Sequence, residues 1–214
     1  MALQVKICGI TTPDAAAAAI EGGAFALGFI FFPRSPRYVA PESAAALARP
    51  MPRSILRVAV SVDATDDTLA AIIRALEPDL LQLHGSESPQ RAAAIKARFG
   101  RPLMKAISVS DAADLAAAES YLGIVEWLLF DAKPPKTPEA LPGGNALAFD
   151  WTLLAGRTWP CPWMLSGGLT SENLAAAVRI SGARTIDVSS GVEDRPGLKN
   201  PAKIAAFLAA ARRL

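Results

Sequence analysis

The chain has 214 residues, with 22 Lys and Arg against 20 Asp and Glu, so its formal net charge is +2. This near-balance gives no reason to expect a nucleic acid or an anionic membrane as a partner. The length suffices for one large domain, which buries roughly 70% of its unfolded surface and needs no disulfide or metal to fold. Because the chain shows neither a membrane-spanning apolar run nor a secretion signal, we expect a cytoplasmic protein with residues 1–214 in one domain.

Short apolar runs alternate with alanine-rich stretches along the whole chain. Continuous apolar runs of this kind are typical of strands that helices cover. Strands are predicted near residues 4–8, 26–31, 56–62, 80–84, 103–107, 127–130, 163–166 and 185–189. Helices are predicted near 13–21, 41–48, 66–76, 89–99, 112–121, 150–154, 171–180 and 201–212, with Asp66, Ser88, Ser110 and Ser171 at or near their N-caps.

Eight strand–helix units of roughly 27 residues predict a single (β/α)8 barrel, or TIM barrel, near the small end of that fold's size range. An open doubly wound sheet is the alternative, but it normally has a glycine-rich fingerprint after its first strand, and residues 8–11 are not one. The longest irregular segment, 132–148, contains four prolines and a glycine pair. Because it directly follows the sixth strand, it is predicted to be a mobile active-site loop, with a plain surface loop as the alternative.

Reactive and anion-binding groups follow several of the predicted strands. In a TIM barrel the carboxyl ends of the strands form the active site, so these groups are expected to converge on one face. They are Cys8, Arg34, Arg37, His84, Asp131, Gly167-Gly168 and Ser190-Gly191. No set of His, Cys and carboxylates has the spacing of a metal site, and no cofactor motif is present. We therefore expect neither a metal nor a cofactor.

The glycine turns after the seventh and eighth strands indicate a phosphate site. Loops in these two positions commonly bind phosphate in this fold, because glycine lets backbone N–H groups approach the oxygens. Either turn alone would be an ordinary connection. Arg34 and Arg37 flank Ser35-Pro36 and indicate a second anionic group on the ligand, since a guanidinium binds a carboxylate through two parallel hydrogen bonds. For either arginine alone, a solvated surface position is the alternative.

Cys8 and Asp131 are a candidate base and acid. A thiol needs a lowered pKa to act as a base near neutral pH, and a carboxyl group must keep its proton in order to donate it. From these residues alone the alternatives stay open. A buried cysteine is commonly a small apolar side chain, and an aspartate after a strand is often a helix cap.

Lys6 is predicted to point into the barrel, because side chains alternate along a strand and Lys6 lies two residues before Cys8. A buried ammonium needs a partner. The first and eighth strands are neighbours in a closed barrel, so we expect an ion pair with Asp187 that also favours the thiolate of Cys8. Lys105 is a second candidate for an interior cation. His84 is expected to line the site without a chemical role.

Seven segments together resemble the phosphoribosylanthranilate isomerase family, and the resemblance covers nearly the whole chain. In this order they are highly specific, although any one alone would not be. They are VKICGIT at 5–11, GFIFFP at 28–33 with SPR at 35–37, LQLHG at 81–85, FDAK at 130–133, GGN at 143–145 with FDW at 149–151, LSGGL at 165–169, and DVSSGVE at 187–193.

The resemblance implies a barrel of the ribulose-phosphate-binding type and a cofactor-free Amadori rearrangement. The substrate would be N-(5-phosphoribosyl)anthranilate and the product 1-(2-carboxyphenylamino)-1-deoxyribulose 5-phosphate, within tryptophan biosynthesis. The general base of the family falls on Cys8 and its general acid on Asp131. The arginine that binds the anthranilate carboxylate falls on Arg37.

The resemblance also implies where the phosphate of the substrate binds. The residues concerned are Gly167, Gly168, Ser190 and Gly191, with Gly144 and Asn145 nearby. In one departure from the family pattern, Ala146 follows Asn145 where a further glycine is common. The expected partner is a small phosphorylated substrate, with no nucleic acid and no membrane, and the expected assembly is a monomer or homodimer.

Two other functions remain as alternatives. One is another phosphosugar barrel enzyme such as indole-glycerol-phosphate synthase, whose family uses lysine and glutamate at strand ends where this chain has a thiol. The other is a barrel that binds a phosphorylated metabolite without catalysis. Such a protein would keep the glycine turns but gain nothing from Cys8 and Asp131.

Overall fold

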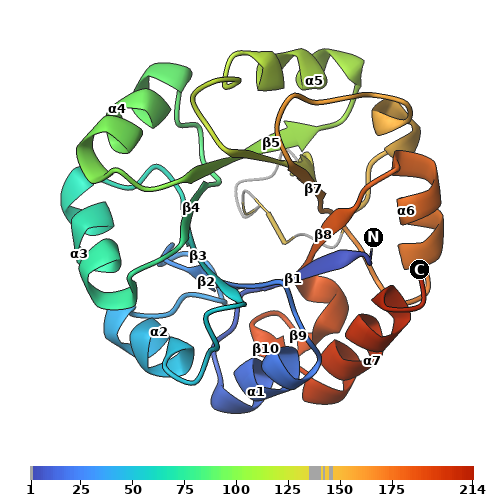
Figure 1. Cartoon of the computed structure of the whole chain (residues 1–214), viewed down its shortest axis with the longest axis horizontal. Coiled ribbons are helices and arrows are strands. Elements are labelled where there is room, and N and C mark those ends of the chain that lie inside the picture. Colours follow the sequence, from blue (N-terminus) through green and yellow to red (C-terminus); the bar gives the residue numbers. More distant parts are fainter. Residues whose placement is uncertain (1, 135–140, 142, 145–146) are drawn as a thin grey trace.

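The computed structural model describes residues 2–134, 141, 143–144 and 147–214. Eight parallel strands close into a barrel in chain order, with the last strand paired to the first (Figure 1). The predicted TIM barrel is confirmed. The strands are β1 (Gln4–Cys8), β2 (Ala26–Ile30), β3 (Leu56–Ser61), β4 (Leu80–Leu83), β5 (Leu103–Val109), β6 (Trp127–Ala132), β7 (Trp163–Leu165) and β8 (Thr185–Val188).

A ring of helices surrounds the barrel (Figure 1). In the described part of the chain they are α1 (Pro13–Glu21), α2 (Pro41–Ala48), α3 (Asp66–Leu76), α4 (Pro89–Phe99), α5 (Ala112–Glu119), α6 (Leu174–Ser181) and α7 (Pro201–Ala211). The helix predicted at 150–154 is instead a single 3-10 turn, η1 (Trp151–Leu154). After β8 the chain forms an unpredicted 3-10 turn, η2 (Ser190–Val192), and a hairpin of β9 (Glu193–Arg195) and β10 (Leu198–Lys199).

Side-chain capping sets where most helices begin. Ser88 caps α4 as predicted, accepting a hydrogen bond from the N–H of Arg91. Asp66 and Ser110 lie near the N-caps as predicted, each beside the capping residue itself, which is Thr65 in α3 and Asp111 in α5. The helix α6 begins at Leu174, three residues after its predicted start at Ser171. The late start of α6 has a local cause, because Asn173 binds the backbone of Thr170 and Gly168 and holds a turn there.

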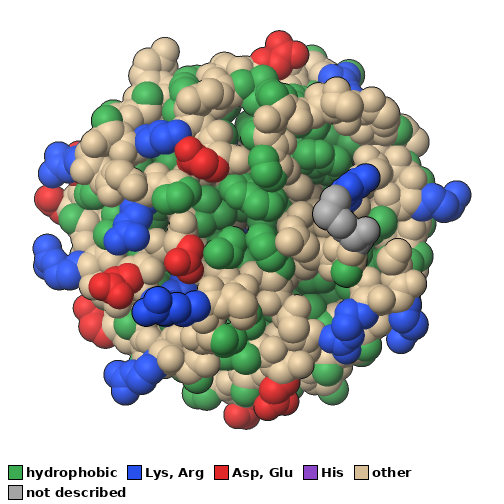
Figure 2. Space-filling model, in the orientation of Figure 1, with side chains coloured by type: hydrophobic (Ala, Val, Ile, Leu, Met, Phe, Trp, Pro, Cys, Tyr) green, Lys and Arg blue, Asp and Glu red, His purple; other side chains and the backbone are tan. Residues whose placement is uncertain are grey.

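Two apolar cores lie on the two sides of the barrel wall. The larger core packs the outward faces of the strands against the helices. The smaller one fills the barrel itself with Cys8, Ala26, Val58, Val60, Leu80, Met104, Ala106, Leu129 and Met164. On the face seen in Figure 2, Lys and Arg side chains are interspersed with Asp and Glu around the edge, without one large patch of a single sign.

An ion pair lies inside the barrel between β1 and β8, as predicted. Lys6 is fully buried, its Nζ is 2.8 Å from Oδ1 of Asp187, and the two residues face each other in the strand register. Burial alone would lower the pKa of Lys6, but Asp187 and the Cys8 thiol outweigh it and raise that pKa above its ordinary value. Lys6 is therefore a charged group in the interior.

Lys105 is buried too, but the prediction of a cation in the barrel interior is wrong. It shares the outward face of β5 with Leu103 and Ile107, which belong to the outer core, and it anchors the loop that follows β4. Its Nζ lies 3.0 Å from Oε2 of Glu87 and donates to the carbonyl groups of Leu83 and Gly85. Glu87 also accepts the backbone N–H groups of Gly85 and Asp63. The pair therefore fixes the backbone beside the last residues of β4.

The interior pair predicts a non-additive effect on stability. Lys6→Met leaves the Asp187 carboxylate buried without its cation and should lower the free energy of unfolding by roughly 3–5 kcal/mol. Adding Asp187→Asn removes that unpaired charge and should recover part of the loss. Chemical denaturation of wild type, both single variants and the double variant measures the coupling. Strictly additive losses of unfolding free energy would show that the interaction between Lys6 and Asp187 does not contribute to stability.

Candidate active site

An open cavity with roughly 770 Å³ of free space, its mouth included, lies at the carboxyl ends of the strands. This end of the barrel is where barrel enzymes of this fold bind their ligands. The cavity brings together groups from across the chain that the sequence analysis expected to converge: Cys8, Arg37, His84, Asp131, Gly144, Gly167, Gly168 and Ser190. Its wall is otherwise largely apolar and includes Ile30, Phe32, Val60 and Leu169.

Cys8 ends β1 and is 5% exposed. Burial raises the pKa of its thiol above the ordinary value, while the ammonium group of Lys6 opposes this rise. Gly28 pairs with Cys8 in the strand register. A Cβ atom at Gly28 would lie 2.9 Å from Sγ of Cys8 and 3.2 Å from Nζ of Lys6. Glycine on β2 therefore leaves the space in which the thiol and the buried ammonium lie together.

Asp131 lies on β6 and is 5% exposed. Its Oδ1 accepts the N–H of Ala132 at 2.9 Å, and its Oδ2 is 3.3 Å from Nε2 of His84. The amide nitrogen of Gln82 is 2.8 Å from Nδ1 of His84. Because an amide nitrogen only donates, Nδ1 accepts and the ring proton lies on Nε2, facing the carboxyl group. Gly143 lets the loop after β6 cross here, since a Cβ would lie 2.5 Å from Nε2 of His84.

His84 thus contacts the candidate acid, although it was predicted only to line the cavity. The hydrogen bond between Gln82 and His84 was not predicted. The sequence did indicate that the two side chains are neighbours, because residues two apart in a strand lie on the same face.

The two predicted phosphate turns lie side by side at the cavity, but they do not contribute equally. Gly167, Gly168 and Ser190 line it, whereas Gly191 is absent from its described lining. A Cβ at Gly191 would lie 1.9 Å from the carbonyl oxygen of Leu169. Gly191 therefore serves the close packing of the turn after β8 on the turn after β7.

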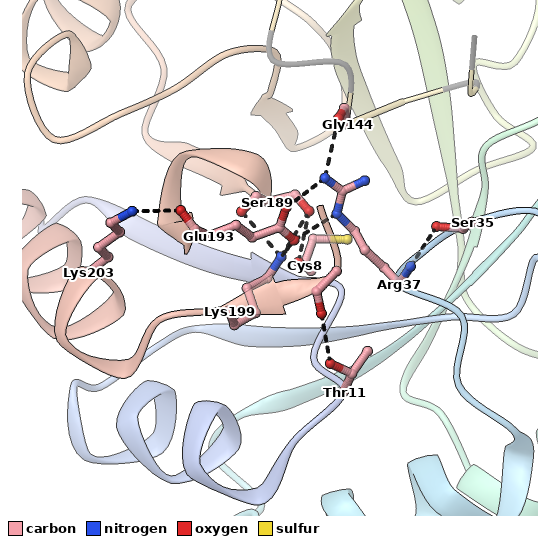
Figure 3. A network of polar contacts seen from close by, with 10 residues as sticks. Cys8, Thr11, Ser35, Arg37, Gly144, Ser189, Glu193, Lys199 and Lys203 are labelled. Atoms are coloured by element: carbon pink, nitrogen blue, oxygen red, sulfur yellow. Dashed lines mark hydrogen bonds and ion pairs between the residues drawn. The ribbon is translucent and has the colours of Figure 1, made fainter. Parts of the chain in front are cut away.

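Arg37 is buried, and one edge of its guanidinium group is held by a carboxylate (Figure 3). Its Nε and Nη2 donate to the two carboxylate oxygens of Glu193, each at 2.8 Å. Nη2 also donates to the carbonyl oxygen of Gly144 at 3.3 Å, which ties it to the loop after β6. Arg34 is exposed and is not among the described residues that line the cavity. Of the two arginines, the structure brings only Arg37 to the candidate site.

Glu193 and Lys199 lie behind Arg37 in the β9–β10 hairpin and were not predicted as site residues. The expected loop residue Asn145 and its neighbour Ala146 lie outside the described residues. Within the described ranges, no group of three or more His, Cys, Asp or Glu could hold a metal ion. No helix in the same part of the chain is both long and apolar enough to cross a membrane.

Comparison with known proteins gives one consistent result. Residues 5–210 match the model of the family described as N-(5'-phosphoribosyl)anthranilate (PRA) isomerase. The chain is 58% identical to N-(5'-phosphoribosyl)anthranilate isomerase of Rhodospirillum centenum over 214 residues, which is 100% of both proteins.

Two solved structures show the same similarity, each with a TM-score of 0.83 and 32% identity, covering 99% of this chain and 100% of the other. One is phosphoribosyl anthranilate isomerase in complex with reduced 1-(o-carboxyphenylamino)-1-deoxyribulose 5-phosphate. The other describes monomers generated from the dimeric enzyme of Thermotoga maritima. The chain therefore belongs to the N-(5'-phosphoribosyl)anthranilate isomerase family and is an isomerase of tryptophan biosynthesis.

Proposed function

We propose that this isomerase converts N-(5-phosphoribosyl)anthranilate into 1-(2-carboxyphenylamino)-1-deoxyribulose 5-phosphate, with Asp131 as general acid and Cys8 as general base. The observation that carries the proposal is that a buried thiol and a buried carboxyl group line one cavity together with an arginine and two glycine turns. The proposal keeps the cytoplasmic location and the monomeric or homodimeric assembly expected from the sequence.

The rearrangement needs one proton delivered and another removed. Asp131 protonates the furanose ring oxygen, the bond from that oxygen to C1′ breaks, and the nitrogen lone pair forms the C1′=N bond of an iminium ion. Cys8 then removes the proton from C2′, and the electrons of that C–H bond form an enolamine. The enolamine tautomerises to the ketone of the product. The hydrogen bond from the N–H of Ala132 and the contact with His84 hold the Asp131 carboxyl group in one orientation.

The ammonium group of Lys6 supports the role of Cys8 as the base, although its partner Asp187 opposes formation of the thiolate. A thiol must lose its proton before it can accept one, and burial opposes that loss. Lys6 places a fixed positive charge beside the thiol, in the space that Gly28 leaves open. Lys6 therefore offsets part of the cost of forming a thiolate inside the barrel.

The ends of the substrate match the two anion-binding parts of the cavity. In the proposal, the anthranilate carboxylate binds Arg37, and the phosphate binds backbone N–H groups of the turns at Gly167, Gly168 and Ser190. Gly144 was expected near the phosphate, but its carbonyl oxygen accepts a hydrogen bond from Arg37, so the loop after β6 contributes to the carboxylate end.

Removal of either proton carrier tests the mechanism directly. Cys8→Ser and Asp131→Asn should each lower kcat by about 10²–10⁴-fold or more while substrate binding survives, since general acid–base groups contribute that much each. The loss of phosphoribosylanthranilate fluorescence measures turnover. Near-normal turnover in either variant would contradict its assignment. A wild-type protein that binds the substrate without converting it would favour the non-catalytic alternative.

Arg37→Ala should instead raise KM strongly, because the guanidinium group binds the ligand and carries no proton in the reaction. The same fluorescence assay, run over a range of substrate concentrations, separates KM from kcat. Arg34→Ala is the matched control, because it removes an exposed arginine from the same loop and should change KM little. An equal rise of KM in both variants would mean that general surface charge, rather than Arg37, attracts the substrate.

The thiolate that the proposed base requires should form as the pH rises. Because the pKa of Cys8 lies above its ordinary value, the rate of Cys8 alkylation in a Cys161→Ser background should increase from about pH 6 to 9. The charged groups that act on the thiol are Lys6, Asp187 and Lys199. In Lys6→Met the thiol loses a neighbouring cation, so this increase should move to higher pH, and an unmoved profile would contradict the role of Lys6. Turnover also needs a protonated Asp131, so kcat/KM should follow a bell-shaped profile rather than rise throughout.

A further inference from the structure

A cluster of three buried charges lies behind the cavity wall at Arg37 (Figure 3). Glu193 begins β9 and Lys199 ends β10, and the two face each other across the hairpin. The Lys199 side chain is fully buried and its Nζ contacts Oε1 of Glu193. The two oxygens of Glu193 are also the ones that hold Arg37. One carboxylate therefore bridges two cations, and only Arg37 lines the cavity.

The surroundings of the cluster favour the charged form of Glu193 and partly oppose that of Lys199. Burial raises the pKa of Glu193, but Arg37 and Lys199 outweigh it and hold that pKa below its usual range. Burial holds the pKa of Lys199 below its ordinary value, and the Glu193 carboxylate opposes this without outweighing it. The Nζ of Lys199 also donates to the carbonyl and hydroxyl oxygens of Ser189, both at 3.2 Å. Together with Oε1 of Glu193, these two oxygens give the Lys199 ammonium group three acceptors, one for each of its three N–H groups.

The charges of the cluster sum to +1. Arg37 and Glu193 alone would form a neutral pair, and a guanidinium neutralised by a buried carboxylate is a poor binder of a second carboxylate. Lys199 adds the charge that Glu193 cancels. Lys203, which donates to the backbone carbonyl of Glu193, adds no net charge because it is paired with Asp194 at 3.0 Å. In a buried site, where the effective dielectric constant is far below that of water, one unit of charge changes anion binding strongly.

We propose that Glu193 and Lys199 are positioning residues for the carboxylate of the substrate, acting through Arg37. Glu193 fixes one edge of the guanidinium group, and Lys199 restores the positive charge that this fixation would otherwise remove. The outcome is an arginine that is rigid and still attracts an anion. This inference rests on the proposed function, since it assumes that an aryl carboxylate binds at Arg37.

A purely structural role for Lys199 must be distinguished from this one. Lys199 binds Ser189, whose hydroxyl group donates to the carbonyl oxygen of Cys8 at 3.0 Å, and Ser190 of the phosphate turn comes next in the chain. A structural loss would therefore weaken every ligand of the cavity. A loss of charge beside Arg37 would weaken only ligands that have the carboxylate.

The test uses two stable product analogues and calorimetry at pH 7. One is reduced 1-(o-carboxyphenylamino)-1-deoxyribulose 5-phosphate, and the other is the same molecule without its carboxylate. Lys199→Met should weaken binding of the first about tenfold or more and leave binding of the second within about threefold. In turnover, the same variant should raise KM by a similar factor with kcat nearly unchanged.

A second variant decides between charge and structure. Lys199→Met with Glu193→Gln returns the cluster to +1, and the new amide oxygen can still accept from Arg37. The double variant should therefore regain most of the preference for the carboxylate that Lys199→Met loses. Lys203→Met is the matched control, because it removes a half-exposed lysine that also bonds to Glu193, through the backbone carbonyl. It should leave the preference unchanged.

Each outcome has one meaning. If wild type binds both analogues equally, the carboxylate site of the proposed function is wrong. If wild type prefers the analogue with the carboxylate but Lys199→Met weakens the binding of both analogues equally, the positioning role is overturned. The same holds if the double variant binds the analogue with the carboxylate more weakly than Lys199→Met does. Where Lys199→Met does not fold, Glu193→Gln alone decides, since a cluster of charge +2 must keep a preference at least equal to that of wild type.

Discussion

A charge inside a protein must be paired, and this requirement shapes the mouth of the barrel. Burial of a lone ammonium or carboxylate is too costly to survive in an apolar interior. Three sets of partners meet the requirement here: Lys6 with Asp187, Lys105 with Glu87, and Arg37 and Lys199 with Glu193. Each set joins residues of different strand–helix units of the barrel. The ion pairs therefore fix the positions of the strand ends and loops that form the cavity.

The three sets also differ in what they do for the site. Lys6 and Asp187 lie under the thiol, and Asp187 itself reaches the cavity. Lys105 and Glu87 hold the backbone after β4, next to the histidine that contacts Asp131. The third set holds the arginine. One physical device, the buried ion pair, thus supports the proposed base, the proposed acid and the proposed carboxylate site from three directions.

The fold and the first ion pair could be predicted because both follow from periodicity. Alternating strands and helices indicate the barrel, and the two-residue repeat of a strand places Lys6 below Cys8 and opposite Asp187. The hairpin that contains Glu193 and Lys199 has no such repeat. Its register depends on tertiary contacts with Arg37 and Ser189, which no local pattern contains. The prediction of a helix after β6 was wrong for a related reason. The segment forms a single 3-10 turn, which has too few residues to show a period.

The glycines also divide into those whose role could be predicted from the sequence and those whose role depends on tertiary packing. Gly167 and Gly168 were expected to approach a ligand, and both line the cavity. Gly191 lies in a turn of the same appearance, yet the space that its missing side chain leaves is filled by the backbone of Leu169. Gly28, inside a strand, was not predicted as a site residue, although the Cys8 thiol and the Lys6 ammonium group lie together beside it. A glycine in a sequence shows that something approaches closely. Whether a ligand, a backbone or a reactive pair does so depends on the packing of segments that the sequence keeps far apart.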